Sequence, residues 1–315
     1  MRPLTTIGIL LMAYGSPDSL DDLELYLLDI RNGRSVSPAL LAEIKDRYAL
    51  IGGRSPLLDL TLAQASELEK ELNQRFESQN LNFRTFVGMR HWQPRIREAV
   101  VQIKTECINQ LIALVLAPHS SLLSTGAYFA RLQEAIDGLG VKIDVTRIES
   151  WHDHSGLIVA FAEKVRAASE LFTPDEPFVI FTAHSLPARI LEAGDPYASQ
   201  LHQTAALLAK QLGLPSYRWT FCYQSASQSP EPWLGPSIDN CILDLIQSGH
   251  KNLLVVPVGF VCDHVEVLYD IDIAARRMAS AHGARLERSE SLNASPVFIS
   301  ALADLVTDNI PSRLL

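Results

Sequence analysis

The stretch Phe178-Val-Ile-Phe-Thr-Ala-His-Ser-Leu-Pro187 decides the fold, because a strand-like run ends abruptly in it. Residues 178–183 are apolar, aromatic or β-branched, which is typical of a parallel strand covered on both faces. Pro187 follows three residues after His184, so the strand cannot continue. Ligands of open α/β sheets bind at the carboxyl ends of the strands. His184 is therefore a candidate site residue, although many histidines at strand ends are only hydrogen-bonded structural residues.

Similar runs recur along the whole chain. The predicted strands are 7–13, 83–89, 110–117 and 141–148 in the first half, and 178–183, 217–223, 253–258 and 284–289 in the second. Amphipathic segments with helical spacing lie between them, and the last strand is followed by a closing helix at 296–308. Buried strands that alternate with helices call for parallel sheets with helices on both faces. The sequence therefore predicts an α/β protein with two Rossmann-like domains, each with a four-stranded parallel sheet flanked by helices.

The two halves also match locally, since Tyr14 and His184 fall at equivalent strand ends. A true duplication and a shared strand–loop pattern both explain this match. The predicted domains are 1–150 and 151–315, with a join near 150–173 and a last helix that can pack back on the N-terminal domain. Two sheets with facing carboxyl-end loops would form a cleft between the domains, a usual place for a small-molecule site.

Composition narrows the functional class. The 315 residues are 47% apolar and 20% charged, with a net charge of −9 and no cluster of Lys and Arg. This balance argues against a nucleic-acid-binding protein. The four cysteines show no C-x-x-C spacing, so we expect no zinc ribbon and no iron–sulfur cluster. The apolar run at 7–13 is too short to span a membrane, so we expect no transmembrane segment and a cytoplasmic location.

A second informative stretch runs from Val255 to Asp272 and joins a strand to a helix that we predict at 263–281. Asp263 and Glu266 have the spacing of a capping box, which is a purely structural explanation. Alternatively, Glu266 and Asp270 share one helix face, and two carboxylates there need a cation or a proton between them. His184 and Glu266 could then meet as metal ligands or as an acid–base pair. Two ligands with open positions suit divalent iron better than a closed structural zinc site.

Six stretches in order resemble the ferrochelatase family. They are Tyr14-Gly-Ser-Pro, Arg47-Tyr-x-x-Ile-Gly-Gly-Arg-Ser-Pro-Leu57, Gly88-Met-Arg-His-Trp, Ala183-His-Ser-Leu-Pro187, Tyr223-Gln-Ser-Ala…Pro-Glu-Pro-Trp-Leu-Gly-Pro236 and Gly259-Phe-Val-Cys-Asp-His-Val-Glu-Val-Leu-Tyr-Asp-Ile-Asp272. Each one alone is a modest signal, whereas six in family order are specific. The resemblance implies the class II chelatase fold, with a porphyrin cleft between two Rossmann-like domains, and insertion of Fe²⁺ in haem biosynthesis.

The resemblance also implies roles for single residues. It makes His184 and Glu266 the catalytic residues and the ligands of the incoming Fe²⁺. Residues implied to bind the porphyrin and its propionates are Tyr14, Arg31, Arg47, Tyr48, Ser55 and Tyr128, with Tyr14 also an axial contact to product iron. Asp270 would belong to an outer metal site. That site is weakened here, because Ala274 stands where family members often have a second acidic residue.

Within the family, the loop after Tyr223 resembles that of bacterial enzymes that metallate coproporphyrin III, and a cysteine-rich C-terminal extension is missing. We therefore expect coproporphyrin III and Fe²⁺ as substrates, no tightly bound cofactor and a monomer. Three alternatives stay open: a protoporphyrin IX ferrochelatase that makes protohaem, a cobalt or nickel chelatase for a sirohydrochlorin-type ring, and a non-catalytic tetrapyrrole or haem carrier.

Overall fold

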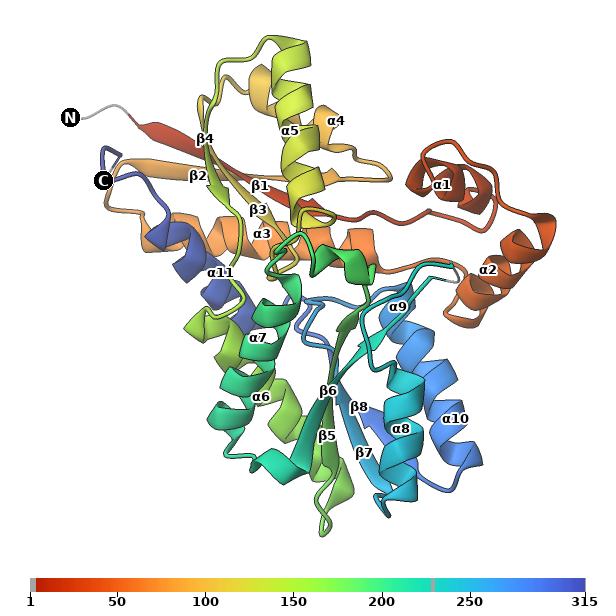
Figure 1. Cartoon of the computed structure of the whole chain (residues 1–315). Coiled ribbons are helices and arrows are strands. Elements are labelled where there is room, and N and C mark those ends of the chain that lie inside the picture. The colour runs from red at the N-terminus through yellow and green to blue at the C-terminus, as the bar shows by residue number, and fades with distance from the viewer. Residues whose placement is uncertain (1–3, 228–229, 315) are drawn as a thin grey trace. The chain divides into compact units, whose positions relative to one another are not determined.

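The computed structural model describes residues 4–227 and 230–314, and within them the chain forms two four-stranded sheets (Figure 1). The strands are β1 (Thr5–Ala13), β2 (Leu81–Met89), β3 (Gln110–Val115), β4 (Asp144–Ile148), β5 (Phe178–His184), β6 (Trp219–Gln224), β7 (Asn252–Val256) and β8 (Arg285–Arg288). The longer helices are α1 (Leu23–Ile30), α2 (Pro38–Leu50), α3 (Leu57–Arg75), α4 (Ile96–Thr105), α5 (Thr125–Leu139), α6 (Ser155–Ser169), α7 (Tyr197–Leu212), α8 (Ile238–Gln247) and α11 (Pro296–Asp308). Short helical turns are Glu170–Phe172, Ala188–Ile190, Ser216–Arg218, α9 (Val265–Leu268), the π-helical segment Asp270–Ala275 and α10 (Arg276–Ala281).

The two sheets have the same topology. Their strand orders are β2-β1-β3-β4 and β6-β5-β7-β8, and every pair of neighbours is parallel. The predicted fold class, two four-stranded parallel sheets flanked by helices, is confirmed. Because β1 and β5 hold the same place in their sheets, Tyr14 directly after β1 and His184 at the end of β5 occupy equivalent positions.

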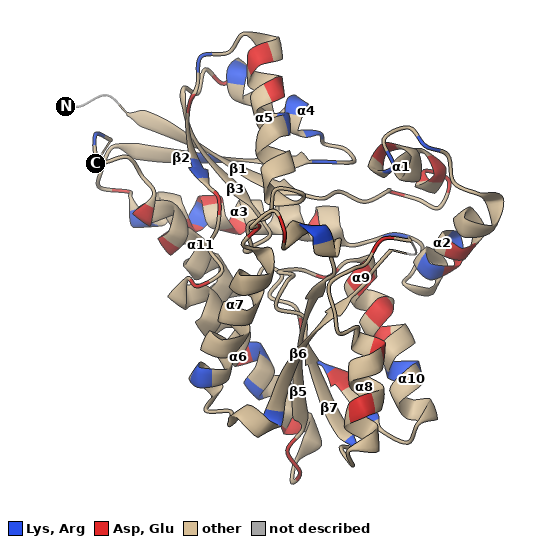
Figure 2. Ribbon diagram, in the orientation of Figure 1, with Lys and Arg blue, Asp and Glu red and all other residues tan. Residues whose placement is uncertain are grey.

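Both faces of each sheet are covered by helices, which explains the apolar strand sequences. Residues Ile7 and Ile9 to Met12 of β1 have no exposed surface. In the first sheet α4 and α5 lie on one face and α3 and α11 on the other, whereas α6 and α7 face α8 and α10 across the second sheet (Figure 1). Figure 2 shows the charged residues mainly on helices and loops. The central strands β1, β3, β5 and β7 carry no Asp, Glu, Lys or Arg, as expected for strands buried on both sides.

The chain divides into two compact units. Unit 1 comprises Met1–Trp151 and Asn293–Leu315, and unit 2 comprises His152–Leu292. In unit 1 the C-terminal helix α11 packs on α3, where Arg75 forms an ion pair with Asp304 at 2.5 Å. The boundary between Trp151 and His152 lies within the segment 150–173 that was predicted to contain the join, and most of that segment is the helix α6 of unit 2.

The prediction of one continuous helix at 263–281 is wrong. The structure breaks it into α9, a π-helical segment and α10, and in the π-helical segment the Ala274 amide donates to the carbonyl of Tyr269, five residues earlier. The extra residue per turn changes which side chains share a face. A π-helical turn inside a helix is frequent at functional sites, where it re-aims side chains.

The predicted capping box is also wrong. His264, not Asp263, is the N-cap residue of α9, and it makes no side-chain capping hydrogen bond. The Asp263 carboxylate instead accepts a hydrogen bond from the Ser291 hydroxyl at 2.8 Å and pairs with the Arg288 guanidinium at 3.2 Å. A mostly buried arginine stabilises a carboxylate more strongly than a single backbone N–H does, because both partners of the hydrogen bond are charged.

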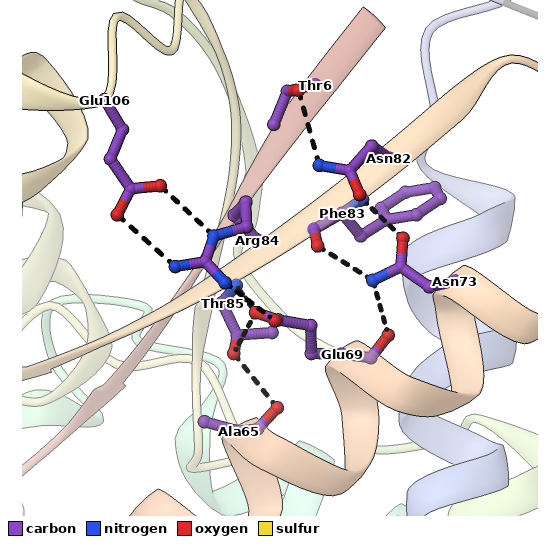
Figure 3. A network of polar contacts seen from close by, with 9 residues as sticks. All are labelled: Thr6, Ala65, Glu69, Asn73, Asn82, Phe83, Arg84, Thr85 and Glu106. Atoms are coloured by element: carbon purple, nitrogen blue, oxygen red, sulfur yellow. Dashed lines mark hydrogen bonds and ion pairs between the residues drawn. The ribbon is translucent and has the colours of Figure 1, made fainter. Parts of the chain in front are cut away.

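The edge strand β2 of unit 1 is covered by two polar side chains of α3 (Figure 3). Asn73 Oδ1 accepts the Phe83 N–H at 2.8 Å, and Asn73 Nδ2 donates to the Phe83 carbonyl at 2.9 Å. One turn earlier, the Glu69 carboxylate accepts the Thr85 N–H at 2.6 Å. An edge strand otherwise presents unpaired backbone groups that invite pairing with another chain. Asn73 and Glu69 therefore close this edge within the unit.

We expect Asn73→Ala to destabilise the protein by about 1–3 kcal/mol, because it leaves two backbone groups of Phe83 without their partner. Asn82→Ala is the matched control, since its side chain donates only one long bond of 3.4 Å to Thr6 and its loss should cost at most about 0.5 kcal/mol. Denaturant unfolding of both variants measures this difference. Equal stability of the Asn73 and Asn82 variants would contradict the account of the edge.

Candidate metal-insertion site

The His184 side chain is held at the carboxyl end of β5 by its surroundings on both sides. Its Nδ1 is hydrogen-bonded to the carbonyl of Ser185, and its own carbonyl accepts the Tyr197 hydroxyl at 3.0 Å. A carbonyl only accepts, so Nδ1 carries a proton and Nε2 is left for other chemistry. The backbone directly after His184 is also held, because the Ser185 N–H donates to the carbonyl of Gln224 on β6.

Glu266 in the first turn of α9 lies between two histidines. Its Oε1 is 3.4 Å from Nε2 of His184, and its Oε2 is 3.5 Å from Nε2 of His264. His264 is itself oriented by a hydrogen bond of Nδ1 to the Cys262 carbonyl at 3.1 Å and by the Phe260 ring at 4.4 Å between centroids. The structure thus brings the two predicted catalytic residues of unit 2 together and adds a third side chain.

Electrostatics favours a shared proton in this group. Burial alone would raise the pKa of Glu266, but the charge and hydrogen bond of His184, and then those of His264, hold that pKa well below its usual range. For His184, burial lowers the pKa, yet the Glu266 carboxylate and the Ser185 carbonyl outweigh it and raise the pKa. Both shifts favour the charged pair over the neutral pair, and the two groups titrate as a unit.

Asp270, the predicted outer residue, lies at the start of the π-helical segment. Its carboxylate accepts a hydrogen bond from the hydroxyl of Ser225, and its charge contributes to the raised pKa of His184. Ser225 has a φ of 59°, a left-handed conformation that is uncommon for residues other than glycine. Ala274 stands where the family resemblance would place a second acidic side chain; it is exposed and supplies no ligand.

The group offers few ligands to a metal. The side chains of His184 and Glu266 keep 29% and 33% of their surface exposed, so both are reachable. Within residues 4–227 and 230–314, no three His, Cys, Asp or Glu side chains are arranged to hold a metal ion together. An imidazole and a carboxylate with open positions fit a metal that is bound briefly, whereas a structural ion has a closed set of four ligands.

Tyr14 belongs to unit 1 and is 42% exposed. Its ring lies 4.6 Å from the ring of His91, whose Nδ1 is 2.8 Å from the Asp29 carboxylate. Gly15 makes this approach feasible, because a Cβ there would lie 2.8 Å from the backbone nitrogen of Trp92, and its φ of +94° also favours glycine. The strand end that matches His184 in unit 1 therefore presents an exposed phenol beside a buried histidine.

The other residues implied to bind porphyrin also lie in unit 1. Arg31 is exposed in the α1–α2 loop and donates to the Arg34 carbonyl at 3.3 Å, and Arg47 pairs with Glu43 at 2.6 Å. Three of them are buried: Tyr48 at 3%, Tyr128 at 4% and Ser55 at 6% exposure. Ser55 Oγ accepts the Leu57 N–H at 3.3 Å, and the Tyr128 ring lies under the Arg90 guanidinium at 5.4 Å.

Sequence reasoning missed His264 and Gln224. His264 stands two residues before Glu266, a spacing that points side chains apart on a helix. The backbone of His264 is extended, with φ of −161° and ψ of 179°, so its side chain can turn toward Glu266. Gln224 was quoted only as part of a loop motif, residues 228 and 229 of which lie outside the described residues. A buried glutamine at the strand end next to His184 was the available signal.

Comparisons with known proteins assign the chain to a family. A family model described as Ferrochelatase matches residues 6–310. A ferrochelatase of Deinococcus radiodurans is 45% identical over 95% of both chains, and a coproporphyrin III ferrochelatase of Bacillus subtilis is 40% identical over 95% of this chain and 96% of its own. Another coproporphyrin III ferrochelatase, from Geobacillus sp. WCH70, is 42% identical over 96% and 98% of the two chains.

Two solved chelatases have a similar fold at low sequence identity. The structure of SirB from Bacillus subtilis with Fe³⁺ aligns with a TM-score of 0.58 at 10% identity, covering 97% of this chain and 96% of its own. CbiX, described as the terminal enzyme of sirohaem biosynthesis in denitrifying bacteria, aligns with a TM-score of 0.54 at 14% identity over 96% and 100%. Two Rossmann-like sheets with this strand order thus have the class II chelatase fold. The chain belongs to the ferrochelatase family.

Among the described residues, no helix combines the length and the apolar character needed to cross a bilayer. Residues 7–13 form the buried part of strand β1.

Gly259 gives a test of how His184 is placed. A Cβ at Gly259 would lie 2.5 Å from Cβ and 2.9 Å from Cα of Ala183, the residue before His184. We expect Gly259→Ala to displace the end of β5, to lower stability by about 1–3 kcal/mol and to shift the NMR signals of the His184 ring.

Gly138→Ala is the control for this substitution, because Gly138 lies in α5 and its added Cβ would meet only the mobile end of Arg97 at 3.4 Å. Helix propensity predicts a gain of up to about 1 kcal/mol there. A Gly259→Ala protein with wild-type stability and unchanged His184 signals would refute the close packing of this strand end.

Proposed function

We propose that this protein inserts Fe²⁺ into coproporphyrin III to give iron coproporphyrin III in haem biosynthesis. The observation that carries the proposal is the His184–Glu266 pair at the carboxyl end of β5, in a chain that belongs to the ferrochelatase family. The coproporphyrin preference is supported by relatives at 42% and 40% identity that bear this substrate in their names. The relative at 45% identity is named only as a ferrochelatase, so protoporphyrin IX is the second candidate substrate.

The chemistry follows from charge balance. A metal-free porphyrin carries two pyrrole N–H protons, and both must leave as Fe²⁺ forms its bonds to the four ring nitrogens. Fe²⁺ binding displaces the proton shared by His184 and Glu266, so Nε2 of His184 is unprotonated when the iron passes to the ring. Nε2 then accepts one pyrrole proton, Glu266 stabilises the imidazolium that forms, and the second proton leaves to solvent at this partly exposed group. The same carboxylate that raises the pKa of His184 thereby makes it a stronger base. His264, on the other oxygen of Glu266, helps to keep that carboxylate ionised through the proton transfers.

The exposed phenol and the arginines of unit 1 supply the remaining functions of the proposal. By the family resemblance, Tyr14 is assigned the axial contact to iron. Arg31 and Arg47 are assigned to the propionates, because a guanidinium fork matches a carboxylate. Tyr48, Ser55 and Tyr128 are also assigned to the porphyrin site, where their burial makes them a support beneath the surface that the ring contacts. Binding energy from the propionate contacts, remote from the metal, bends the macrocycle so that its nitrogen lone pairs point to one face.

Iron enters this scheme as substrate, and the proposal includes no resident cofactor or iron–sulfur cluster. Asp270, held by Ser225, is proposed as part of an outer metal site for the incoming ion. This site is weakened because Ala274 supplies no acidic side chain. A monomeric state and a cytoplasmic location stay predictions from the sequence.

Anaerobic mixing of the protein with Fe²⁺ and either coproporphyrin III or protoporphyrin IX, followed by absorbance, tests the proposal. We expect metallated product with a clear preference for coproporphyrin III, and a loss of about 10²-fold or more in His184→Ala, which removes the base and a ligand. His282→Ala is the control, because His282 is an exposed residue after α10.

The alternatives give different results in the same experiment. A preference for protoporphyrin IX would overturn the coproporphyrin assignment alone. A metal-free porphyrin spectrum that persists with bound ligand would indicate a carrier without catalysis. Near-normal turnover of His184→Ala would refute the assigned role of His184.

A further inference from the structure

We propose that Gln224 is a positioning residue that fixes the separation of His184 and Glu266 and thereby sets the affinity of the site for Fe²⁺. The inference rests on the proposed function and deepens it. Gln224 is the last residue of β6 and pairs in register with His184 on β5. Its side chain is 1% exposed, so both ends of its amide need partners within the protein.

Both ends of the amide are engaged, and they join two different elements. Gln224 Oε1 accepts the hydroxyl of Thr182, which lies on β5 two residues before His184, at 2.8 Å. Gln224 Nε2 donates to the backbone carbonyl of Glu266 in α9 at 2.9 Å. The amide therefore connects the strand that carries the histidine with the helix that carries the carboxylate.

This connection matters because α9 is only four residues long and is followed by π-helical geometry. A helix of one turn contributes little stability of its own. The position of Glu266 thus depends on contacts from other elements, and the Gln224 amide holds its backbone from the direction of β5. Ser225, the next residue, binds the Asp270 carboxylate. The last residue of β6 and the residue that follows it therefore hold Glu266 and Asp270, respectively.

Only an amide meets both requirements at residue 224. Glutamate keeps the acceptor toward Thr182 but, when ionised, cannot donate to the Glu266 carbonyl and repels it. Leucine offers neither group and leaves a buried carbonyl unpaired. Residues that orient metal ligands without touching the metal typically change metal affinity by about 10- to 100-fold when they are replaced.

The test is steady-state iron insertion by Gln224→Glu and Gln224→Leu, with Fe²⁺ and porphyrin varied separately. We expect KM for Fe²⁺ to rise about 10- to 100-fold, while KM for porphyrin stays within about twofold of the wild-type value. Thr182→Val removes only the hydroxyl that braces the amide, so it should raise KM for Fe²⁺ less. Combined with Gln224→Leu it should add nothing, because both changes interrupt the same connection.

Gln64→Leu is the matched control. Gln64 is a fully buried glutamine of α3 whose amide also donates to a backbone carbonyl at 2.9 Å, that of Asn293, and it belongs to unit 1. Its replacement should lower the melting temperature without changing KM for Fe²⁺. This control separates loss of a buried amide in general from loss of the amide that joins β5 and α9.

Folded Gln224 variants with a wild-type KM for Fe²⁺ would overturn the positioning role and leave the proposed function standing. The role is likewise refuted if these variants only lose stability and kcat as Gln64→Leu does, with no selective change in KM for Fe²⁺. If the wild-type protein inserts no iron into either porphyrin, the proposed function fails and the inference fails with it.

Discussion

The ion pair between His184 and Glu266 is the interaction on which the candidate site of unit 2 depends. It brings Nε2 of His184, at the end of a strand, to 3.4 Å from Oε1 of Glu266, at the start of a helix, although the two residues are 82 positions apart in the sequence. Gly259 allows the chain before α9 to pass directly over Ala183, where any larger residue would collide with β5. Burying a polar group costs free energy unless the group is paired. The arrangement of His184 and Glu266 is therefore stable only when the hydrogen-bond partners of both residues are in place.

Unit 1 also has a glycine that allows a close approach at a strand end. Gly15 brings the strand end of β1 against Trp92, and the adjacent Tyr14 packs against His91, which is in turn held by Asp29. Each unit thus places a candidate site residue at the end of the strand that lies second in its sheet order, β1 or β5. The chemistry at the two ends differs: a phenol in unit 1, and a histidine with an ionised carboxylate in unit 2.

The sequence was sufficient for the strand–helix alternation, because central strands without charges and amphipathic helices carry strong local signals. It was also sufficient for the pairing of His184 with Glu266, once the family motifs were read together. It was insufficient for the segment from Asp263 to Ala281, where the contacts of Asp263 with Arg288 and of Asp270 with Ser225 come from distant parts of the chain. The contact of His264 with Glu266 was not predicted for a related reason, because an extended backbone, and not a helical one, turns the His264 side chain toward Glu266.

The most direct test of the central claim counts protons when iron binds. Iron-free protein is titrated anaerobically with Fe²⁺ at about pH 6, below the raised pKa of His184, by calorimetry in buffers that differ in ionisation enthalpy. Because the ion must replace the proton shared by His184 and Glu266, we predict a release of about one proton per Fe²⁺ that is lost in His184→Ala. Binding without proton release, or an equal release in the variant, would contradict the claim.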